Sequence, residues 1–231
     1  MSLPETGDYI NIHTHGALKT PDIFSVENIM AHEGRAPADV SGIAYTYGIH
    51  PWFLNNENHD QLIKSVKEIS GDPRIIAIGE AGLDKLKGAS PDLQISTFEE
   101  QIAISEERNK PLIIHCVRAW DELLASHKKL HPEMPWLVHG FRGSVELARQ
   151  LLSKGVYLSF WFDFVLRAES ADLFKSLPED RIFLETDGAD VDIRDIYKKV
   201  SKDMDIDVNE LKSIILSNFK EFFTDHQPAK E

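Results

Sequence analysis

Two histidines, one residue apart, end a short apolar run near the start of the chain. They are His13 and His15 in the segment YINIHTH. Residues two apart in a β-strand point to the same side, so both imidazoles could reach one ion. A His-X-His pair is weak evidence by itself, because it also occurs as ordinary packing. It indicates a metal site only if partners lie elsewhere in the chain.

Four further imidazole or carboxylate side chains each end another apolar run. Each alone has an ordinary explanation, since a carboxylate can cap a helix and a histidine can be a satisfied core residue. A bare polar group is costly to bury in such a run, whereas a divalent metal turns it into a ligand. Because all lie at the same end of their runs, we favour a shared metal site over chance. They are Glu80 in IIAIGEAGLD, His115 in PLIIHC, His139 in WLVHG and Asp187 in RIFLETD.

The apolar runs themselves have the composition of buried strands. Several are almost continuously apolar, which is typical of parallel strands covered on both faces. We expect eight strands, over residues 9–13, 22–29, 42–50, 74–80, 111–116, 136–140, 155–160 and 181–187. Apolar residues at helical spacing predict helices over residues 92–109, 118–130, 144–153 and 208–223.

Strands that alternate with helices favour an α/β fold with a parallel sheet. Eight such strands in 231 residues fit a (β/α)8, or TIM, barrel at the small end of its range. In that fold the carboxyl ends of all strands meet on one face, where active sites lie. The first two connections are short, and the second contains Gly34 and Pro37. We therefore expect the first two outer helices to be shortened or missing, and a single domain over residues 1–231.

The composition limits the partners of the chain. A formal net charge of −13 repels nucleic acid unless a bound metal reverses the sign locally. The single cysteine, Cys116, permits no internal disulfide, and we do not expect it to be a nucleophile. The start of the chain, MSLPETGDY, lacks the pattern of a signal peptide, and the apolar runs are too short to span a bilayer. We expect a cytoplasmic protein that does not enter a membrane, and the sequence indicates no particular protein partner.

In this order, the motifs resemble the TatD family of metal-dependent hydrolases, within the amidohydrolase superfamily. The matching segments are NIHTH, GIHPW, IIAIGEAGLD, PLIIHCVRAWDELL, HGFRGSVELA, GVYLSF and RIFLETD. The resemblance implies a (β/α)8 barrel, two divalent metal ions and hydrolysis of phosphodiester bonds in DNA. It implies that one metal is held by His13, His15 and Asp187, and the other by His115 and His139, with Glu80 as the bridge.

Several features depart from the family pattern, among them Asn11 and the segment after Asp187. Asn11 stands where the family usually has an aspartate, which alters a residue behind the ligands. The segment after Asp187 leads almost directly into a helix, whereas the family more often has a longer loop with proline and basic residues. The short loop and the acidic charge weigh against polymeric DNA and leave the metal chemistry intact.

Mixed imidazole and carboxylate ligands suit zinc, manganese, nickel or cobalt better than magnesium. Two such ions could share a bridging water or hydroxide and lower its pKa. We predict Asp187 as the general base, with Glu80 as the second catalytic carboxylate.

Five further side chains near strand ends are candidate substrate contacts. Arginine can bind phosphate oxygens through two hydrogen bonds, and tryptophan can stack on a base. Each residue could equally be an ordinary rim residue. The candidates are His50, Trp52, Lys85, Arg118 and Arg142.

Three functions stay open on the sequence alone. The first is a TatD-type phosphodiesterase or deoxyribonuclease acting on DNA or on a small phosphodiester, which Arg118 and Arg142 weakly favour. The second is a small-molecule amidohydrolase, such as a lactonase or deacylase, on the same binuclear site. The third is a non-catalytic metal-binding or scaffold protein. A scaffold needs none of the six ligands, so their presence argues against it.

Overall fold

The computed structural model describes residues 3–167 and 169–224 and contains all eight predicted strands. Their bounds agree within a few residues, except that the fourth strand runs four residues further than predicted. They are β1 (Tyr9–Thr14), β2 (Ile23–Met30), β3 (Ile43–Gly48), β4 (Ile75–Asp84), β5 (Leu112–Val117), β6 (Trp136–Val138), β7 (Tyr157–Trp161) and β8 (Ile182–Glu185).

The eight strands form one sheet in which each strand lies beside its neighbours in the sequence. Parallel pairing joins β1 to β2, β3 to β4, β4 to β5 and β7 to β8. Every residue of β3 and β4 is buried, and so are nearly all residues of β1 and β2. This burial on both faces explains why the strands read as continuous apolar runs.

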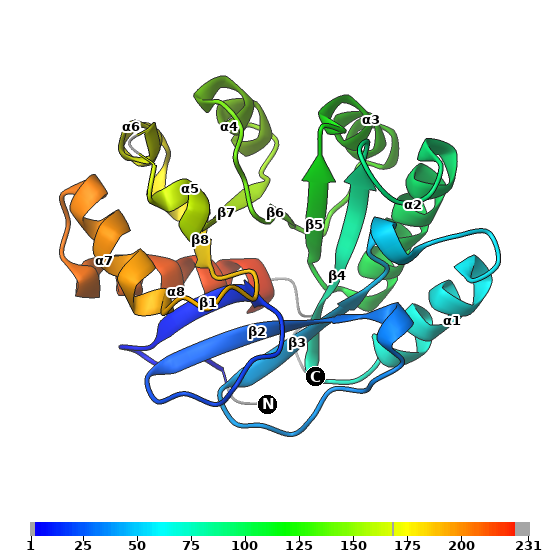
Figure 1. The fold of residues 1–231 in the computed structure, drawn as a ribbon, viewed down its shortest axis with the longest axis horizontal. Helices are drawn as coiled ribbons and strands as arrows, with labels where there is room; N and C mark the ends of the chain where they lie inside the picture. Colours follow the sequence, from blue (N-terminus) through cyan, green and yellow to red (C-terminus); the bar gives the residue numbers. More distant parts are fainter. Residues whose placement is uncertain (1–2, 168, 225–231) are drawn as a thin grey trace. The chain divides into compact units, whose positions relative to one another are not determined.

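Helices follow most of the strands (Figure 1). The four predicted helices are present as α2, α3, α4 and α8, and α7 begins soon after Asp187, as expected. The bounds are α1 (His59–Ile69), α2 (Pro91–Arg108), α3 (Trp120–Leu130), α4 (Val145–Leu152), α5 (Phe162–Val165), α6 (Glu169–Ser176), α7 (Ile193–Met204) and α8 (Val208–Thr224), with 3-10 turns η1 (Ala31–Glu33), η2 (Pro51–Phe53) and η3 (Glu179–Arg181).

The first two outer helices are reduced, as the sequence predicts. Between β1 and β2, where every residue is described, the chain forms no helix. Between β2 and β3 it forms only η1, which ends at Gly34 in the left-handed conformation. Glycine adopts that conformation without strain and here ends the turn.

The described residues group into two compact units. Of the described residues, the first unit holds 3–27, 40–44, 138–167 and 169–224. The second unit holds residues 28–39 and 45–137. The single domain expected from the sequence stays a prediction.

In the first unit, α7 and α8 pack on β1 and β8 (Figure 1). The hydroxyl of Tyr197 in α7 accepts a hydrogen bond from the Ile10 backbone N–H (3.1 Å) and donates one to the Ile10 carbonyl (3.0 Å). The rings of Phe24 in β2 and Phe219 in α8 meet edge to face, with centroids 5.4 Å apart. The C-terminal helices therefore fix the strand that carries His13.

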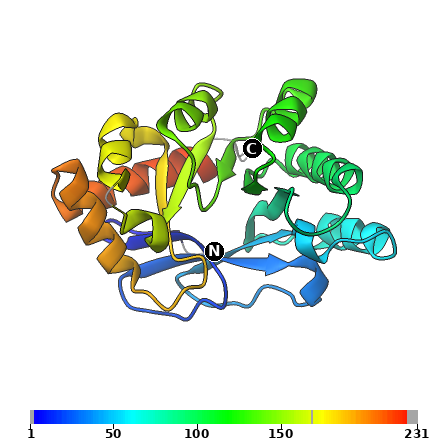
Figure 2. The same ribbon diagram turned by 45° about the horizontal axis from the view of Figure 1, so that its top comes forward.

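In the second unit, α2 packs beside β4, and α1 and α3 flank α2 (Figure 2). Phe98 and Ile102 of α2 are fully buried in this layer. The amide of Gln101, on the same helix, accepts from the Ile49 N–H (2.7 Å) and donates to the Ile49 carbonyl (3.2 Å). These bonds anchor the end of β3 immediately before His50.

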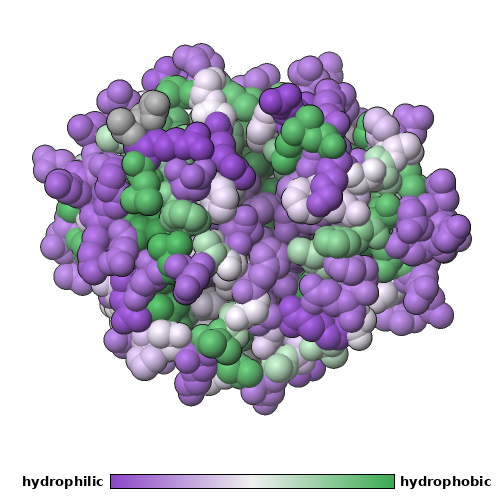
Figure 3. All heavy atoms as spheres, in the orientation of Figure 1, coloured by the Kyte–Doolittle hydropathy of each residue, from purple (hydrophilic) through white to green (hydrophobic). Residues whose placement is uncertain are grey.

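Hydrophilic side chains cover most of the face shown in Figure 3, with hydrophobic residues in small patches between them. In the part of the chain that the structure describes, no helix is both long enough and apolar enough to cross a membrane.

Candidate metal centre

The first unit brings together three of the predicted ligands at the ends of β1 and β8. The Oδ1 atom of Asp187 lies 3.6 Å from Nε2 of His13 and 3.5 Å from Nε2 of His15. His13 is fully buried, whereas the side chains of His15 and Asp187 are 31% and 26% exposed. Two imidazole nitrogens and a carboxylate oxygen thus converge where one metal ion could bind all three.

Backbone and side-chain hydrogen bonds between β1 and β8 position Asp187. Its backbone, in the left-handed region with φ +51°, donates from N–H to the His13 carbonyl at 3.1 Å. Asn11 accepts from the Thr186 N–H (3.0 Å) and donates to the Thr186 hydroxyl (2.9 Å), which in turn donates to the Thr14 hydroxyl (3.0 Å). Asn11, the residue that departs from the family pattern, therefore joins the two strands that carry the ligands.

His139 belongs to the same unit and lies beside His13, with ring centroids 4.2 Å apart. Its Nδ1 atom is 3.4 Å from Oε1 of Glu185, which is completely buried and accepts a hydrogen bond from the Ser159 hydroxyl. Glu185 was not identified from the sequence. The only signal was a carboxylate inside a buried strand, where charged residues are rare unless they are paired. His139, Glu185 and Asp187 form a second possible metal group in this unit.

The second unit contains the other acidic ligand, Glu80. Because β4 continues to Asp84, Glu80 lies inside the strand rather than at its end. Its Oε1 atom is 3.0 Å from Nδ1 of His115 and 3.2 Å from Nε2 of His50. His50 was expected at the rim as a substrate contact, but it is only 4% exposed and faces Glu80 instead.

Two contacts of His50 bear on the orientation of its ring. Its Nδ1 atom accepts a hydrogen bond from the Trp52 backbone N–H at 3.1 Å. Its Nε2 atom faces Glu80 and helps to orient that carboxylate. His50, Glu80 and His115 together form a group of side chains that could hold a metal ion in this unit.

His115 contacts a second buried carboxylate. Its Nε2 atom lies 3.2 Å from Oδ2 of Asp84, a buried carboxylate. Burial raises the pKa of Asp84, but hydrogen bonds from the Trp52 indole and the Leu86 N–H outweigh it and lower that pKa below its usual value. An ionised carboxylate only accepts, so the proton of His115 lies on Nε2.

Nδ1 of His115 lies 3.0 Å from Oε1 of the second carboxylate, Glu80. Imidazole with carboxylate is a donor set that divalent metals prefer. The residues of the second unit therefore fit a metal ion held by Glu80 and His115.

Asn28 of β2 holds Glu80 of β4, two strands away in the sheet. Its Oδ1 atom accepts from the Glu80 backbone N–H at 2.7 Å and from the Thr46 hydroxyl at 3.0 Å. Its Nδ2 atom donates to Oε2 of Glu80 at 3.4 Å. An asparagine within an apolar strand gave no signal in the sequence that it supports a candidate ligand on another strand.

Comparison with known proteins shows which family the chain belongs to. A model of TatD related DNases matches residues 36–224, which is most of the chain. The chain belongs to the TatD family. The resemblance noted from its motifs is thereby confirmed.

Several relatives share sequence with this TatD protein. The uncharacterized metal-dependent hydrolase YabD of Bacillus subtilis is 36% identical over 126 residues, which cover 53% of this chain and 49% of YabD. The 3'-5' ssDNA/RNA exonuclease TatD of Erwinia billingiae is 32% identical over 147 residues, which cover 62% of this chain and 56% of that protein. The chain thus spans about half the length of these relatives.

Solved structures agree on the fold of this TatD protein. The Escherichia coli TatD homologue YjjV superposes with a TM-score of 0.79 and 18% identity, over 95% of this chain and 99% of YjjV. A TatD family hydrolase from Entamoeba histolytica gives a TM-score of 0.76 over 95% of this chain and 99% of that chain, at 17% identity. The (β/α)8 fold class predicted from the sequence is confirmed.

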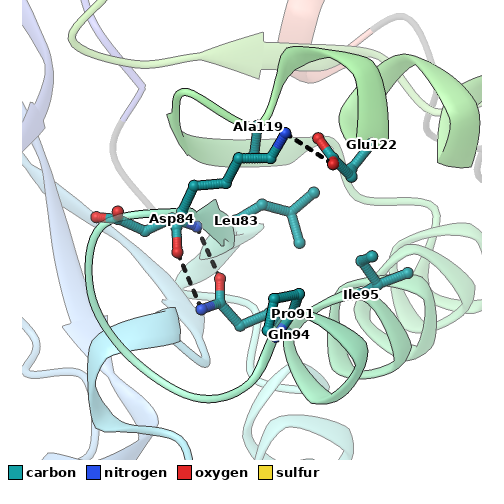
Figure 4. Close-up of a pocket in the computed structure, with 8 residues that line it drawn as sticks. Leu83, Asp84, Pro91, Gln94, Ile95, Ala119 and Glu122 are labelled. Carbon is teal, nitrogen blue, oxygen red and sulfur yellow. Dashed lines mark hydrogen bonds and ion pairs between the residues drawn. The ribbon is translucent and has the colours of Figure 1, made fainter.

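Two of the candidate substrate contacts of this TatD protein form ion pairs with acidic neighbours. Lys85 forms an ion pair with Glu122 (2.8 Å) and lines the open pocket shown in Figure 4. Arg142 stacks on the Trp161 ring at 4.4 Å, with Nη1 4.0 Å from a carboxylate oxygen of Asp163.

The remaining candidates differ in exposure and contacts. Arg118 is exposed and has a left-handed backbone with φ +55°. Trp52 is 39% exposed, its indole N–H donates to Asp84 at 2.6 Å, and the Lys87 ammonium lies 3.7 Å from the ring centroid. Cys116, which we did not expect to be a nucleophile, has its pKa raised to about 12 by burial and so stays a thiol.

Proposed function

We propose that this TatD-family protein is a divalent-metal-dependent hydrolase that cleaves phosphodiester bonds. The observation that carries the proposal is the convergence of His13, His15 and Asp187 on one point in the first unit. Membership of the TatD family and relatives named as ssDNA/RNA exonucleases support the substrate class. The substrate is a nucleic acid strand or a small phosphodiester.

Two ions serve this reaction in the proposal. One is held by His13, His15 and Asp187, and the other by Glu80 and His115. Zinc, manganese, nickel or cobalt suits these donors better than magnesium. When bound, such ions polarise a phosphoryl oxygen and lower the pKa of water.

Asp187 acts as the general base in this proposal. Its carboxylate is 26% exposed, so it can accept a proton from an attacking water and pass it to solvent. His13, fully buried on the other side, keeps the carboxylate in place. Glu80 stays a buried acceptor whose orientation is set by Asn28 and His50.

The test is the substitution Asp187→Asn, which keeps the size of the side chain and removes its basic oxygen. We expect the rate on bis(p-nitrophenyl) phosphate to fall by about 10²–10⁴-fold, while the circular dichroism spectrum stays that of the wild type. Asp195→Asn is the matched control, since Asp195 is an exposed carboxylate on α7 paired with Lys198. A variant at position 187 that turns over as fast as the wild type contradicts the proposal.

A second candidate, a small-molecule amidohydrolase on the same residues, is favoured by the ion pairs of Lys85 and Arg142. These two cations lie against Glu122 and Asp163, which weakens the case that they bind phosphate. A screen with end-labelled single-stranded DNA, bis(p-nitrophenyl) phosphate, p-nitrophenyl acetate and simple lactones separates the two. Ester or lactone hydrolysis without any phosphodiester hydrolysis overturns the first proposal. Metal binding without any hydrolysis supports a non-catalytic protein instead.

A further inference from the structure

Two exposed cations of the second unit form no ion pair with any carboxylate among the described residues. They are Lys87, three residues after the end of β4, and Arg118, directly after the end of β5. The chain has 38 acidic and 25 basic residues, so an exposed cation readily meets a carboxylate, as Lys85 meets Glu122. The charges of these two side chains are therefore available to a ligand.

The register of the sheet places the two cations on neighbouring loops. Asp84 and Val117 are partners in the parallel pairing of β4 and β5, and the Lys85 N–H donates to the Val117 carbonyl at 3.0 Å. The chain thus leaves both strands at the same level. His115, one of the proposed metal ligands, lies two residues before the end of β5. Both loops therefore begin at the edge of the sheet that carries the metal cluster of this unit.

The ammonium of Lys87 has a defined position although the side chain is exposed. Its Nζ atom lies 3.7 Å from the centroid of the Trp52 ring, whose face attracts a cation. The Lys87 N–H donates to Oδ1 of Asp84 at 3.1 Å, and its carbonyl accepts from Nε2 of Gln94 at 3.3 Å. Both the backbone and the charged end of this residue are thus fixed.

Gly88 allows the loop to lie close enough to Trp52 for this contact. Its backbone has φ +101°, and a Cβ atom at this position would lie 2.3 Å from the Pro51 carbonyl oxygen. Only glycine fits such an approach without strain. The next residue, Ala89, donates its N–H to the same carbonyl at 3.3 Å. The segment Pro51–Trp52 and the loop after β4 therefore form one packed structure that carries Lys87.

Arg118 adopts a backbone conformation that suits other residues better. Its φ of +55° lies in the left-handed region, which glycine and asparagine adopt more readily than arginine. The side chain is exposed and makes no hydrogen bond to the described part of the chain that would offset this strain. Residues held in this way are concentrated at functional sites, where the direction of the side chain matters. The strain at Arg118 therefore points to a ligand outside the chain.

We propose that Lys87 and Arg118 form a phosphate-binding subsite for single-stranded nucleic acid, and that they bind backbone phosphates next to the one that is cleaved. Arginine binds phosphate through two hydrogen bonds, and lysine binds it as a point charge. Such cations supply the local attraction that a chain of net charge −13 needs for a nucleic acid. The inference rests on the proposed function in taking a phosphodiester as substrate, and it selects the strand over the small phosphodiester.

A strand that resists hydrolysis tests the inference without turnover. The probe is a fluorescein-labelled phosphorothioate dodecamer of thymidine, and its binding to the full chain in zinc-containing buffer is followed by fluorescence anisotropy. Lys87→Met keeps the length of the side chain, and Arg118→Asn keeps a residue that tolerates the left-handed backbone. We expect each variant to bind about 2–10-fold more weakly. The slope of log affinity against log salt should fall by about 0.7 for each cation removed.

Three controls separate a phosphate contact from other effects. Lys128→Met removes an exposed lysine in the last turn of α3 and should bind the strand as the wild type does. Lys87→Arg and Arg118→Lys keep the charge and should retain most of the affinity. Arg118→Asn should melt at no lower temperature than the wild type, because it relieves the left-handed strain. If circular dichroism shows that Lys87→Met is unfolded, Arg118→Asn carries the test by itself.

The outcomes distinguish this inference from the proposed function. Unchanged affinity in folded variants overturns the inference, as does an equal loss in Lys128→Met or a wild type that binds no strand. An equally large loss on a dithymidine phosphorothioate, which has a single linkage, assigns the cations to the cleaved phosphate and also overturns it. Weakened strand binding in a protein that hydrolyses no phosphodiester leaves the subsite standing while the proposed function fails.

Discussion

At the scale of single residues, each unit places a carboxylate beside an imidazole. Asp84 lies at Nε2 of His115 (3.2 Å), and Glu185 lies at Nδ1 of His139 (3.4 Å). The carboxylates contact different nitrogens of the two rings. Nδ1 of His115 and Nε2 of His139 lie on the side of each ring away from that carboxylate. Residues behind a ligand in this way tune its basicity and direction.

Asn11 of β1 is hydrogen-bonded to Thr186, the residue before Asp187. Replacing its side chain should lower the stability of the protein. Asn11→Ala deletes two buried hydrogen bonds to Thr186 and leaves the Thr186 N–H without its acceptor. We expect the free energy of unfolding to fall by about 1–3 kcal/mol, measured by urea denaturation. Asn11→Asp restores the acceptor and should fall between the wild type and the alanine variant. An alanine variant as stable as the wild type contradicts this role.

The sequence identified the six predicted ligands more readily than the residues that support them. His13, His15 and Asp187 end apolar runs, where a polar group needs a reason, and the structure brings them together. Asp84 and Glu185 lie close in sequence to Glu80 and Asp187, so nothing in the spacing distinguishes the supporting carboxylate from the ligand. Such roles depend on which side chain a strand neighbour contacts, and that information is not in the local sequence.

At the scale of secondary-structure elements, α8 packs onto the first unit through the buried ring of Phe219. The ring is 1% exposed and meets Phe24 and Phe223. Phe219→Ala should lower the free energy of unfolding by about 3–5 kcal/mol, because it removes a large buried side chain and leaves a cavity. Leu166→Ala, at a site that is 68% exposed, should change it by less than about 0.5 kcal/mol. Chemical denaturation of both variants checks the difference, and equal losses contradict it.

The turn between α1 and β4 carries a pH-dependent contribution. Asp72 accepts hydrogen bonds from the Arg74 side chain (2.9 and 2.6 Å) and backbone N–H (2.8 Å), which outweigh burial and lower its pKa from 3.8 to about 2. Because the folded pKa lies below the unfolded one, this stabilisation is complete above about pH 4 and is lost as the pH falls through 2.

The substitution Asp72→Asn tests that contribution. At pH 5 the wild type should melt at a higher temperature than the variant, and the difference should shrink as the pH approaches 2. Thermal unfolding followed by circular dichroism across this range is the measurement. A difference that stays constant from pH 5 to pH 2 shows that the ionised carboxylate of Asp72 does not contribute.

The elements differed in how well the sequence predicted them. Continuous apolar runs identified every strand, and Gly34 with Pro37 identified the missing helix before β3. Helix α1 was not predicted, since its buried residues Leu62, Ile63 and Val66 span little more than one turn. The four-residue α5 is too short to show a helical period at all.

At the scale of the whole molecule, metal and charge act together. The chain carries a formal net charge of −13, and each cluster concentrates carboxylates further. Divalent ions that bind only the folded state reduce the repulsion between these negative charges and stabilise the fold by mass action. At a free zinc concentration 100 times the dissociation constant, one site contributes about 2.7 kcal/mol.

Zinc should therefore raise the melting temperature of the wild type by about 5–10 °C over the chelator-treated protein. Differential scanning calorimetry with and without EDTA measures the shift. Asp187→Asn, which weakens one cluster, should show a smaller rise, while Asp195→Asn should match the wild type. Equal melting temperatures with and without zinc indicate that neither cluster binds the ion under those conditions.

The contact between β1 and β8 also determines when, during synthesis, the residues of the first cluster can come together. Asn11 and Thr186 are 175 residues apart, and Asp187 follows directly. Ribosomes deliver the two histidines of β1 first and the aspartate that completes their cluster much later. During translation, a nascent chain that has not yet emerged as far as β8 presents His13 and His15 without Asp187. The candidate metal centre of the first unit can therefore assemble only after β8 has been made.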